Sequence, residues 1–273
     1  MSIERQIVDA IIQEYKNKEG IFKNIDNLLE YQCPINVKYG SNEHANFYFY
    51  LIYNDHGTKS IKLYERFKNL YYNNPELFKA EYIIKNFENE EKLYESFLSN
   101  MGLRYPKESA KSWIKNSFLL FEKYKGEAIN LYNSSNNALE LFNNIKQFRS
   151  YGMKTTGLLL RVIKGVGFNN NLYNFENVPL PVDIHDSRIA LFCNLYNEVD
   201  IENVYQTKHI KKISSIWQQI AEQLNIKWEE LDKALWLLGS IGCANNMCEI
   251  CPIRFYCQKG KKIEKNLFDY TSL

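Results

Sequence analysis

The stretch FRSYGMKTTGLLLRV, residues 148–162, joins two helical segments through a tight turn at residues 150–152. The segment NALELFNNIKQF before the turn and the run KTTGLLLRVI after it both carry apolar residues at helical spacing. Such a turn directs backbone N–H groups outward at the start of the second helix, where they suit a phosphate. The sequence therefore predicts a pair of helices joined by a short hairpin that can bind an anion.

Helical periodicity continues on both sides of this hairpin. Ile3, Ile7 and Ile11 form one apolar stripe. Ser41 suits the N-cap of one helix, and Pro106 suits the first residue of another. No alternating strand pattern persists, and we expect most of the aromatic residues, 15% of the chain, to lie in the core. The pattern predicts an all-α protein.

The composition is that of an ordinary globular protein. The chain has 273 residues, of which 45% are hydrophobic and 24% charged, with a net charge of +2. No apolar run approaches the roughly 18 residues that a membrane span requires. The N-terminal stretch MSIERQIVDAIIQEYK has charges throughout and lacks the apolar centre of a secretory signal. We expect a cytoplasmic protein without a membrane partner, whose cysteines stay reduced.

Lys154 lies in the first turn of the helix that follows the hairpin. The helix dipole disfavours a cation there, which lowers the cost of losing a proton, and burial acts in the same direction. A neutral, nucleophilic amine becomes accessible. Gly157, one turn further on, has no side chain to crowd a ligand that Lys154 approaches. The alternative is a solvated surface lysine that contacts a carbonyl.

Asp183 opens the helical segment DIHDSRIAL. Its structural interpretation is an N-cap, with Asp186 three residues further on. A cap carboxylate is also fixed in direction and kept ionised by backbone N–H groups, so opposite Lys154 it can stabilise a cationic sugar. His185 and Arg188 follow on the same helix, and each taken alone has an ordinary structural interpretation.

Four of the six cysteines fall in one short segment near the C-terminus. Their spacing is Cys243-x4-Cys248-x2-Cys251-x5-Cys257. Zinc sites with four cysteines typically use two CxxC pairs, whereas this segment has one. The spacing therefore favours a [4Fe–4S] cluster, with zinc and no metal as alternatives. Cys33 and Cys193 lie elsewhere, and we expect both to be buried packing residues.

These features, in this order, resemble the helix-hairpin-helix DNA glycosylases of the endonuclease III type over residues 46–257. GMKTTGLLLRVI resembles the second half of the family's hairpin, whose catalytic lysine falls on Lys154. PVDIHDSR resembles the family's V-D-x-H-x-x-R, whose catalytic aspartate falls on Asp183. LWLLGSIGC and the cysteines after it resemble the last helix and the cluster loop, residues 243–257.

Further segments carry the resemblance to residues that contact DNA. GLRYPKESAKSWIKN is similar to the segment whose apolar tip enters the DNA stack, which places Leu103 at the tip. IYNDHGTK stands where the family has an S-Q-x-T turn, so His56 or Asn54 is expected to fill the space that a flipped base leaves. The resemblance implies further DNA contacts at Ser150, Gly152, Thr155, His185 and Arg188.

The sequence departs from the family pattern at several points. The hairpin usually reads L-P-G-x-G, whereas this chain has FRSYG, with Ser150 in place of the first glycine. The first cysteine spacing is four residues rather than six. The interval from Lys154 to Asp183 is closer to that of archaeal 8-oxoguanine glycosylases, and the usual glutamine is missing from the NDHGT turn. An oxidised base is the expected substrate, while the turn does not identify which one.

The resemblance implies two helical lobes with a DNA-binding cleft between them. Residues 46–166 would form the central helical domain, and residues 1–45 with 167–273 a discontinuous second domain that carries the cluster loop. The expected protein is a monomer that acts on damaged double-stranded DNA at the nucleoid of a prokaryotic cell.

The implied activity is base-excision repair by a DNA N-glycosylase that is also an abasic-site lyase. Asp183 would stabilise the charge that develops at C1′ of the flipped nucleotide, and Lys154 would attack that carbon and form a Schiff base. The alternatives are a monofunctional glycosylase in which Asp183 activates water, a DNA- or lesion-binding protein without catalysis, and a cluster-bearing redox or scaffold protein unrelated to DNA.

Overall fold

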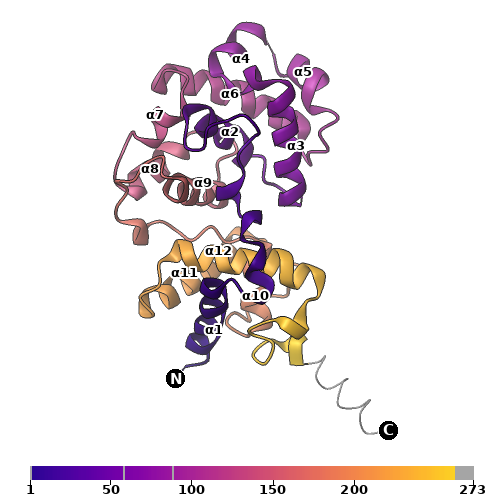
Figure 1. The fold of residues 1–273 in the computed structure, drawn as a ribbon, viewed down its shortest axis with the longest axis vertical. Coiled ribbons are helices and arrows are strands. Elements are labelled where there is room, and N and C mark those ends of the chain that lie inside the picture. Colours follow the sequence, from indigo (N-terminus) through magenta and orange to yellow (C-terminus); the bar gives the residue numbers. More distant parts are fainter. Residues whose placement is uncertain (1, 58, 88, 262–273) are drawn as a thin grey trace. The chain divides into compact units, whose positions relative to one another are not determined.

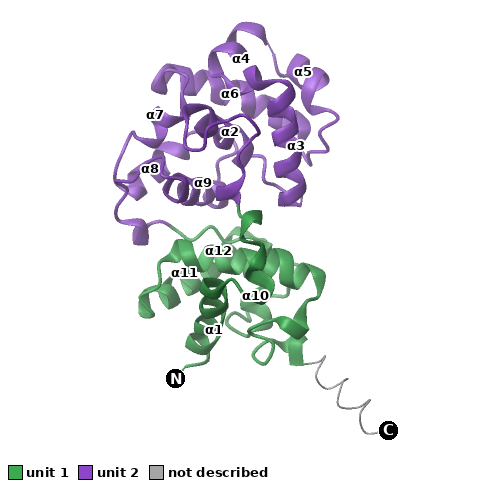
Figure 2. Ribbon diagram, viewed as in Figure 1, with its two compact units in different colours: residues 1–28, 179–273 green, residues 29–178 purple. Residues whose placement is uncertain are grey.

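The computed structural model describes residues 2–57, 59–87 and 89–261. Over these residues the chain is helical and contains no β-strand, only an isolated bridge between Asn137 and Tyr173 (Figure 1). The all-α prediction is confirmed. The chain forms two compact units: unit 2 comprises residues 29–178, and unit 1 comprises residues 1–28 together with 179–273 (Figure 2).

Unit 2 extends beyond the range of residues 46–166 that the sequence suggests for the central domain. The Tyr48 hydroxyl donates to the backbone oxygen of Leu29 at 2.7 Å. The Asn169 amide donates to the backbone oxygen of Tyr132 at 2.9 Å. These bonds attach the segments on either side of the range to its helices.

Over its described residues, unit 2 contains eight α-helices. Its helices are α2 (Asn42–Ile52), α3 (Ser60–Asn73), α4 (Ala80–Asn86), α5 (Glu90–Leu93), α6 (Pro106–Tyr124), α7 (Ala128–Tyr132), α8 (Ala138–Ile145) and α9 (Met153–Val166). Shorter 3₁₀ segments lie at Leu29–Tyr31, Pro75–Phe78 and Phe175–Asn177, and a π-helical turn lies at Tyr94–Leu98. Ser41 caps α2 by accepting the N–H of His44 at 3.3 Å, and Pro106 begins α6, both as predicted.

The centre of unit 2 is α2, in which every residue from 44 to 52 is buried. A helix buried on all sides is a core element. Trp113 of α6 stacks on Tyr50 with 4.8 Å between ring centroids and on Phe67 with 5.9 Å. The indole N–H of Trp113 donates to the backbone oxygen of Leu77 at 2.8 Å. Aromatic side chains from several helices thus form this core.

A buried ion pair fixes the position of α9 within unit 2. Nε of Arg161 lies 2.8 Å from Oε1 of Glu30, and Nη2 lies 3.2 Å from Oε2. The side chains are 2% and 3% exposed. The pair joins α9 to the turn Leu29–Tyr31, and removing either partner would leave an uncompensated buried charge.

The part of unit 1 that the structure describes, residues 2–28 and 179–261, contains four α-helices and the cysteine segment. Its helices are α1 (Ile3–Asn17), α10 (Ile184–Phe192), α11 (Thr207–Gln223) and α12 (Trp228–Leu237). A π-helical turn at Leu238–Gly242 follows α12, and 3₁₀ segments lie at Gly20–Asn27, Cys243–Asn245 and Cys248–Ile250. Both α1 and α10 pack against α12.

Two glycines allow close packing where α12 leads into the cysteines. A Cβ placed on Gly239 would lie 2.5 Å from Cβ of His185 and 3.1 Å from its Cα. A Cβ on Gly242 would lie 2.6 Å from Cδ1 of Ile21. The start of α10 therefore rests directly on the turn that carries the chain into Cys243.

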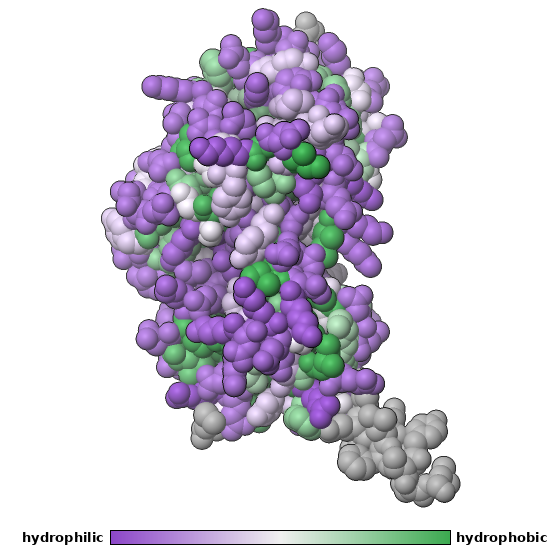
Figure 3. All heavy atoms as spheres, viewed as in Figure 1, coloured by the Kyte–Doolittle hydropathy of each residue, from purple (hydrophilic) through white to green (hydrophobic). Residues whose placement is uncertain are grey.

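On the face drawn in Figure 3, hydrophilic residues predominate and hydrophobic residues occur in small separate groups. Among the described residues, none of the helices has both the length and the apolar character needed to cross a bilayer.

Arg161→Ala should reduce the free energy of unfolding by about 3–5 kcal/mol, because it strands the Glu30 carboxylate in the core. The matched control is Arg5→Ala, which breaks an exposed ion pair with Asp9 and should cost at most about 1 kcal/mol. Urea denaturation monitored by circular dichroism measures both. Equal costs for the two variants would contradict the structural role of the buried pair.

Candidate active site

The turn between α8 and α9 takes a left-handed conformation at Ser150, with φ at 65°. Glycine adopts this region without steric cost, whereas a serine does so under strain. The Ser150 hydroxyl is hydrogen-bonded to that of Ser112 at 2.8 Å. Asn116 accepts the N–H of Arg149 at 2.7 Å and donates to its carbonyl at 3.0 Å. These bonds from α6 hold the hairpin in its turn, although serine stands where the endonuclease III type of hairpin has glycine.

The N-terminus of α9 is closed by a side chain of its own first turn. The Thr155 hydroxyl accepts the N–H of Gly152 at 2.9 Å and donates to the carbonyl of Ser150 at 3.3 Å. Thr155 is fully buried, so its hydroxyl serves the hairpin, and its expected role in DNA binding stays a prediction. Gly152 is exposed, and a Cβ there would meet no atom within 4 Å, so a ligand can approach the helix at this point.

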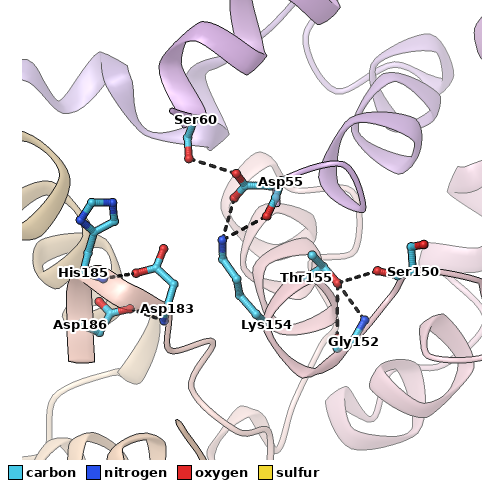
Figure 4. A network of polar contacts seen from close by, with 9 residues as sticks. All are labelled: Asp55, Ser60, Ser150, Gly152, Lys154, Thr155, Asp183, His185 and Asp186. Atoms are coloured by element: carbon cyan, nitrogen blue, oxygen red, sulfur yellow. Dashed lines mark hydrogen bonds and ion pairs between the residues drawn. The ribbon is translucent and has the colours of Figure 1, made fainter. Parts of the chain in front are cut away.

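Lys154 reaches back from α9 to the segment after α2 (Figure 4). Its Nζ lies 3.1 Å from Oδ2 of Asp55 and 3.3 Å from the Asp55 carbonyl oxygen. Ser60, at the start of α3, donates to Oδ1 of the same carboxylate at 3.1 Å. The Asp55 side chain is 5% exposed and that of Lys154 is 29% exposed. The lysine is therefore anchored and half-buried rather than fully solvated.

Four residues that the sequence assigns to DNA contacts line one small pocket in unit 2. They are Asn54, His56, Leu103 and Ser150. Leu103 is 9% exposed, so its side chain forms part of the pocket wall here. The Asn54 amide donates to the Tyr50 carbonyl at 2.8 Å and accepts from Ser109 at 2.5 Å.

His56 is the more accessible of the two candidates for filling the space of a flipped base, because its side chain is exposed whereas that of Asn54 is buried. Partial burial lowers the pKa of the His56 imidazole, and the positive charge of Lys154 lowers it further. The imidazole is therefore biased toward its neutral form, which can both donate and accept a hydrogen bond.

Asp183 is the N-cap of α10 in unit 1, as predicted (Figure 4). Its Oδ1 accepts the N–H of His185 at 2.7 Å, and its own N–H donates to Oδ2 of Asp186 at 2.8 Å. Burial raises the pKa of Asp186 well above its usual range, and the charges of Asp183 and Asp232 act in the same direction. The raised pKa of Asp186 biases the negative charge of this helix end toward Asp183.

The four clustered cysteines line a second pocket, in unit 1. Its wall also includes Cys193, from the end of α10. The neighbouring Cys257 raises the pKa of the Cys193 thiol, and Cys193 is in turn the main cause that lowers the pKa of Cys257 to about 6. Within the described ranges, no three His, Cys, Asp or Glu side chains are grouped tightly enough to hold a metal ion.

Thiolates are the donor type that soft metals favour, and cysteine side chains line much of this pocket. Burial raises the pKa of Cys243 to about 11, against the opposing charge of Arg188 on α10. Burial also raises the pKa of Cys251 to about 12. A metal supplies the positive charge that buried thiolates need, so the residues present fit a thiolate-bound centre.

Sequence reasoning missed Asp55 and Cys193. Asp55 precedes His56 in the NDHGT turn. Because that turn was already assigned to the site, its carboxylate could have been recognised as a candidate partner for Lys154. Cys193 is the C-cap of α10, about one helical turn after Ile189. Both residues line the cysteine pocket. Lys154 belongs to unit 2, whereas Asp183 and the cysteines belong to unit 1.

Comparisons with known proteins agree with this geometry. Residues 150–265, somewhat less than half of the chain, match a family model described as AGOG, N-glycosylase/DNA lyase. A solved structure of endonuclease III trapped as a covalent intermediate with DNA, in an estranged-adenine complex, has a similar fold. Its TM-score is 0.59 at 15% sequence identity, with 97% of this chain and 99% of that chain covered. Comparison with curated proteins finds no match.

The family match begins at the hairpin residue Ser150 and includes Lys154, Asp183 and the four clustered cysteines. The fold match extends over nearly the whole chain. Residues 150–265 are therefore similar to the N-glycosylase/DNA lyase family, and the fold of the chain is similar to that of endonuclease III.

Proposed function

We propose that this protein is a base-excision-repair DNA N-glycosylase that removes an oxidised base from duplex DNA and then cleaves the strand as an abasic-site lyase. The observation that carries the proposal is the placement of the Lys154 amine. The amine lies at the start of α9 and is bound to Asp55. The residues on either side of Asp55, Asn54 and His56, line a pocket together with Leu103.

The first chemical task is to break the bond between the base and the sugar. As that bond lengthens, positive charge develops at C1′ of the flipped nucleotide. Asp183 suits the stabilisation of this charge, because its direction is fixed by the helix cap and its neighbour Asp186 is biased toward the neutral form. The Asp183 carboxylate acts electrostatically and keeps its own electrons.

Lys154 performs the second task. Its neutral amine donates an electron pair to C1′ while the departing base takes the electrons of the glycosidic bond. The nitrogen then carries two protons and releases one of them to solvent. The bond between C1′ and the ring oxygen breaks, the oxygen takes up a proton, and the nitrogen and C1′ are left as a protonated Schiff base. Loss of a proton from C2′ and departure of the 3′ phosphate complete the strand break by β-elimination. Pairing to Asp55 keeps the amine at a fixed position before this sequence begins.

The cysteine pocket is proposed to hold a [4Fe–4S] cluster through Cys243, Cys248, Cys251 and Cys257. A single zinc ion needs all its sulfurs at about 2.3 Å from one point, whereas a cluster binds each thiolate through a different iron. Since members of the matched family lack such a cluster, the proposal rests on the cysteines themselves. The cluster would hold the loop in shape, and no chemical step requires it.

Borohydride should trap the wild-type protein covalently on a duplex that carries an abasic site, because it reduces the Schiff base of Lys154. Lys154→Gln cannot form that bond and should give no adduct and no strand cleavage, while it still binds the duplex. Lys164→Gln makes the same change on the same helix and should behave as wild type. Gel electrophoresis of the reduced mixture measures the adduct.

A panel of duplexes with 8-oxoguanine, thymine glycol, uracil or mismatched adenine identifies the base that is removed. Base release that leaves an unbroken abasic site would favour a monofunctional glycosylase in place of the lyase. Equal affinity for damaged and intact duplex without base release would favour a binding protein.

Asp183→Asn should slow base release in a single turnover by about 10²–10³-fold, because it removes the charge that stabilises C1′. Asparagine caps a helix as well as aspartate does, so α10 should keep its start and the protein its thermal stability. Quenched-flow measurement of released base, with a melting curve of each variant, separates the two effects. Wild-type excision by this variant would exclude Asp183 from the chemistry.

Protein purified without oxygen should contain about four iron and four sulfide ions per chain. Cys248→Ala should lose this content and its visible absorption, whereas Cys33→Ala, outside the cysteine pocket, should retain both. Zinc without sulfide would identify the alternative metal, and the absence of both metals would contradict a metal centre.

A further inference from the structure

The Asp55 carboxylate is held firmly before any substrate arrives. Its side chain is 5% exposed, and its backbone N–H donates to the Ile52 carbonyl at 3.1 Å in the turn that ends α2. Oδ1 accepts from Ser60 at 3.1 Å, which leaves Oδ2 for Lys154. The carboxylate is therefore a fixed acceptor and does not follow the lysine as the lysine moves.

One residue offers two acceptors to the lysine amine. Nζ of Lys154 lies within hydrogen-bond distance of both Oδ2 and the carbonyl oxygen of Asp55. Two N–H bonds directed at these oxygens fix the orientation of the amine. Because the nitrogen is tetrahedral, its remaining position points away from Asp55. In the neutral amine that position can hold the electron pair that attacks C1′.

The charges around the amine act in opposite directions. The N-terminus of α9 disfavours a cation at Lys154, whereas the buried Asp55 carboxylate stabilises the ammonium form. His56 is close enough to Lys154 and Asp55 to feel their charges. Burial is the main cause that lowers the pKa of its imidazole, and the positive charge of Lys154 is the second cause. Tyr64 of α3 lies near Asp55. The charges of Asp55, Arg161 and Glu30 all act on the Tyr64 hydroxyl. Arg161 and Glu30 are already paired with each other, whereas Asp55 places a negative charge directly against Nζ.

We propose that Asp55 is the positioning residue for Lys154. The Asp55 carboxylate stabilises the ammonium form of the lysine and orients its amine. It thereby sets the pH above which the lysine becomes a nucleophile. This inference rests on the proposed function, in which Lys154 forms the Schiff base. The ammonium ion must release one proton to solvent before its electron pair can bond to C1′. The exposed part of the Lys154 side chain provides the route for that proton.

The test is the pH dependence of borohydride trapping on an abasic duplex in Asp55→Asn. Asparagine keeps the size and one acceptor oxygen but removes the charge. The midpoint of the trapping rate should move to lower pH by about one unit or more, because a carboxylate no longer stabilises the ammonium ion. The plateau rate should fall, because the amine loses part of its orientation.

Two further variants separate charge from shape. Asp55→Glu retains the charge and should keep a midpoint close to that of wild type. Asp9→Asn removes the same charge from an exposed site on α1 and should alter neither the midpoint nor the plateau. A wild-type midpoint in Asp55→Asn, with the variant folded as judged by circular dichroism, would overturn the proposal.

A second readout does not depend on catalysis. Acylation of Lys154 by acetic anhydride across a pH series, followed by peptide mass spectrometry, measures when the amine becomes reactive. Labelling in Asp55→Asn should begin at lower pH than in wild type, and identical labelling profiles would overturn the proposal. Shifted labelling with no trapped adduct in the wild type would uphold the role of Asp55 and would reject the lyase chemistry instead.

Discussion

The buried ion pair between Arg161 and Glu30 is the constraint on which the candidate site of unit 2 depends. It anchors α9 to the segment that precedes α2, so the first turn of α9 begins at a fixed place. Lys154 projects from that turn, and its reach to Asp55 is possible only while α9 keeps this position. The pair lies almost two helical turns from the amine, so it controls the geometry of the site without touching a reacting atom.

The candidate nucleophile is held between two opposing fields. The helix dipole and partial burial oppose a charge on Lys154, while the carboxylate of Asp55 favours it. A lysine exposed to the dipole alone would lose its proton readily but would have no fixed direction. A lysine bound to a buried carboxylate alone would be well placed but protonated. The helix dipole and the buried carboxylate both act on Lys154. Its amine is therefore held in a fixed direction and can still release its proton.

The helices and their starts could be predicted because local chemistry determines them. Ser41, Pro106 and Asp183 each satisfy a helix terminus through their own side chain or ring, whatever surrounds them. Ser150 shows where this reasoning stops, because a serine in the left-handed region is supported by Ser112 and Asn116, more than thirty residues away. The pairing of Asp55 with Lys154 spans 99 residues and leaves no local pattern, and Cys193 joins the cysteine pocket from another helix.

The cysteine segment can influence Asp183 without taking part in chemistry. The chain runs from α12 through the turn Leu238–Gly242 directly into Cys243, and Gly239 in that turn lies against His185 at the start of α10. At the other end of α10, Cys193 and Cys257 line the same pocket. Both ends of the helix that carries Asp183 are thus attached to the cysteine segment. A centre that binds these thiolates would fix the direction of the Asp183 carboxylate through packing alone, which is what an electrostatic stabiliser of a developing charge requires.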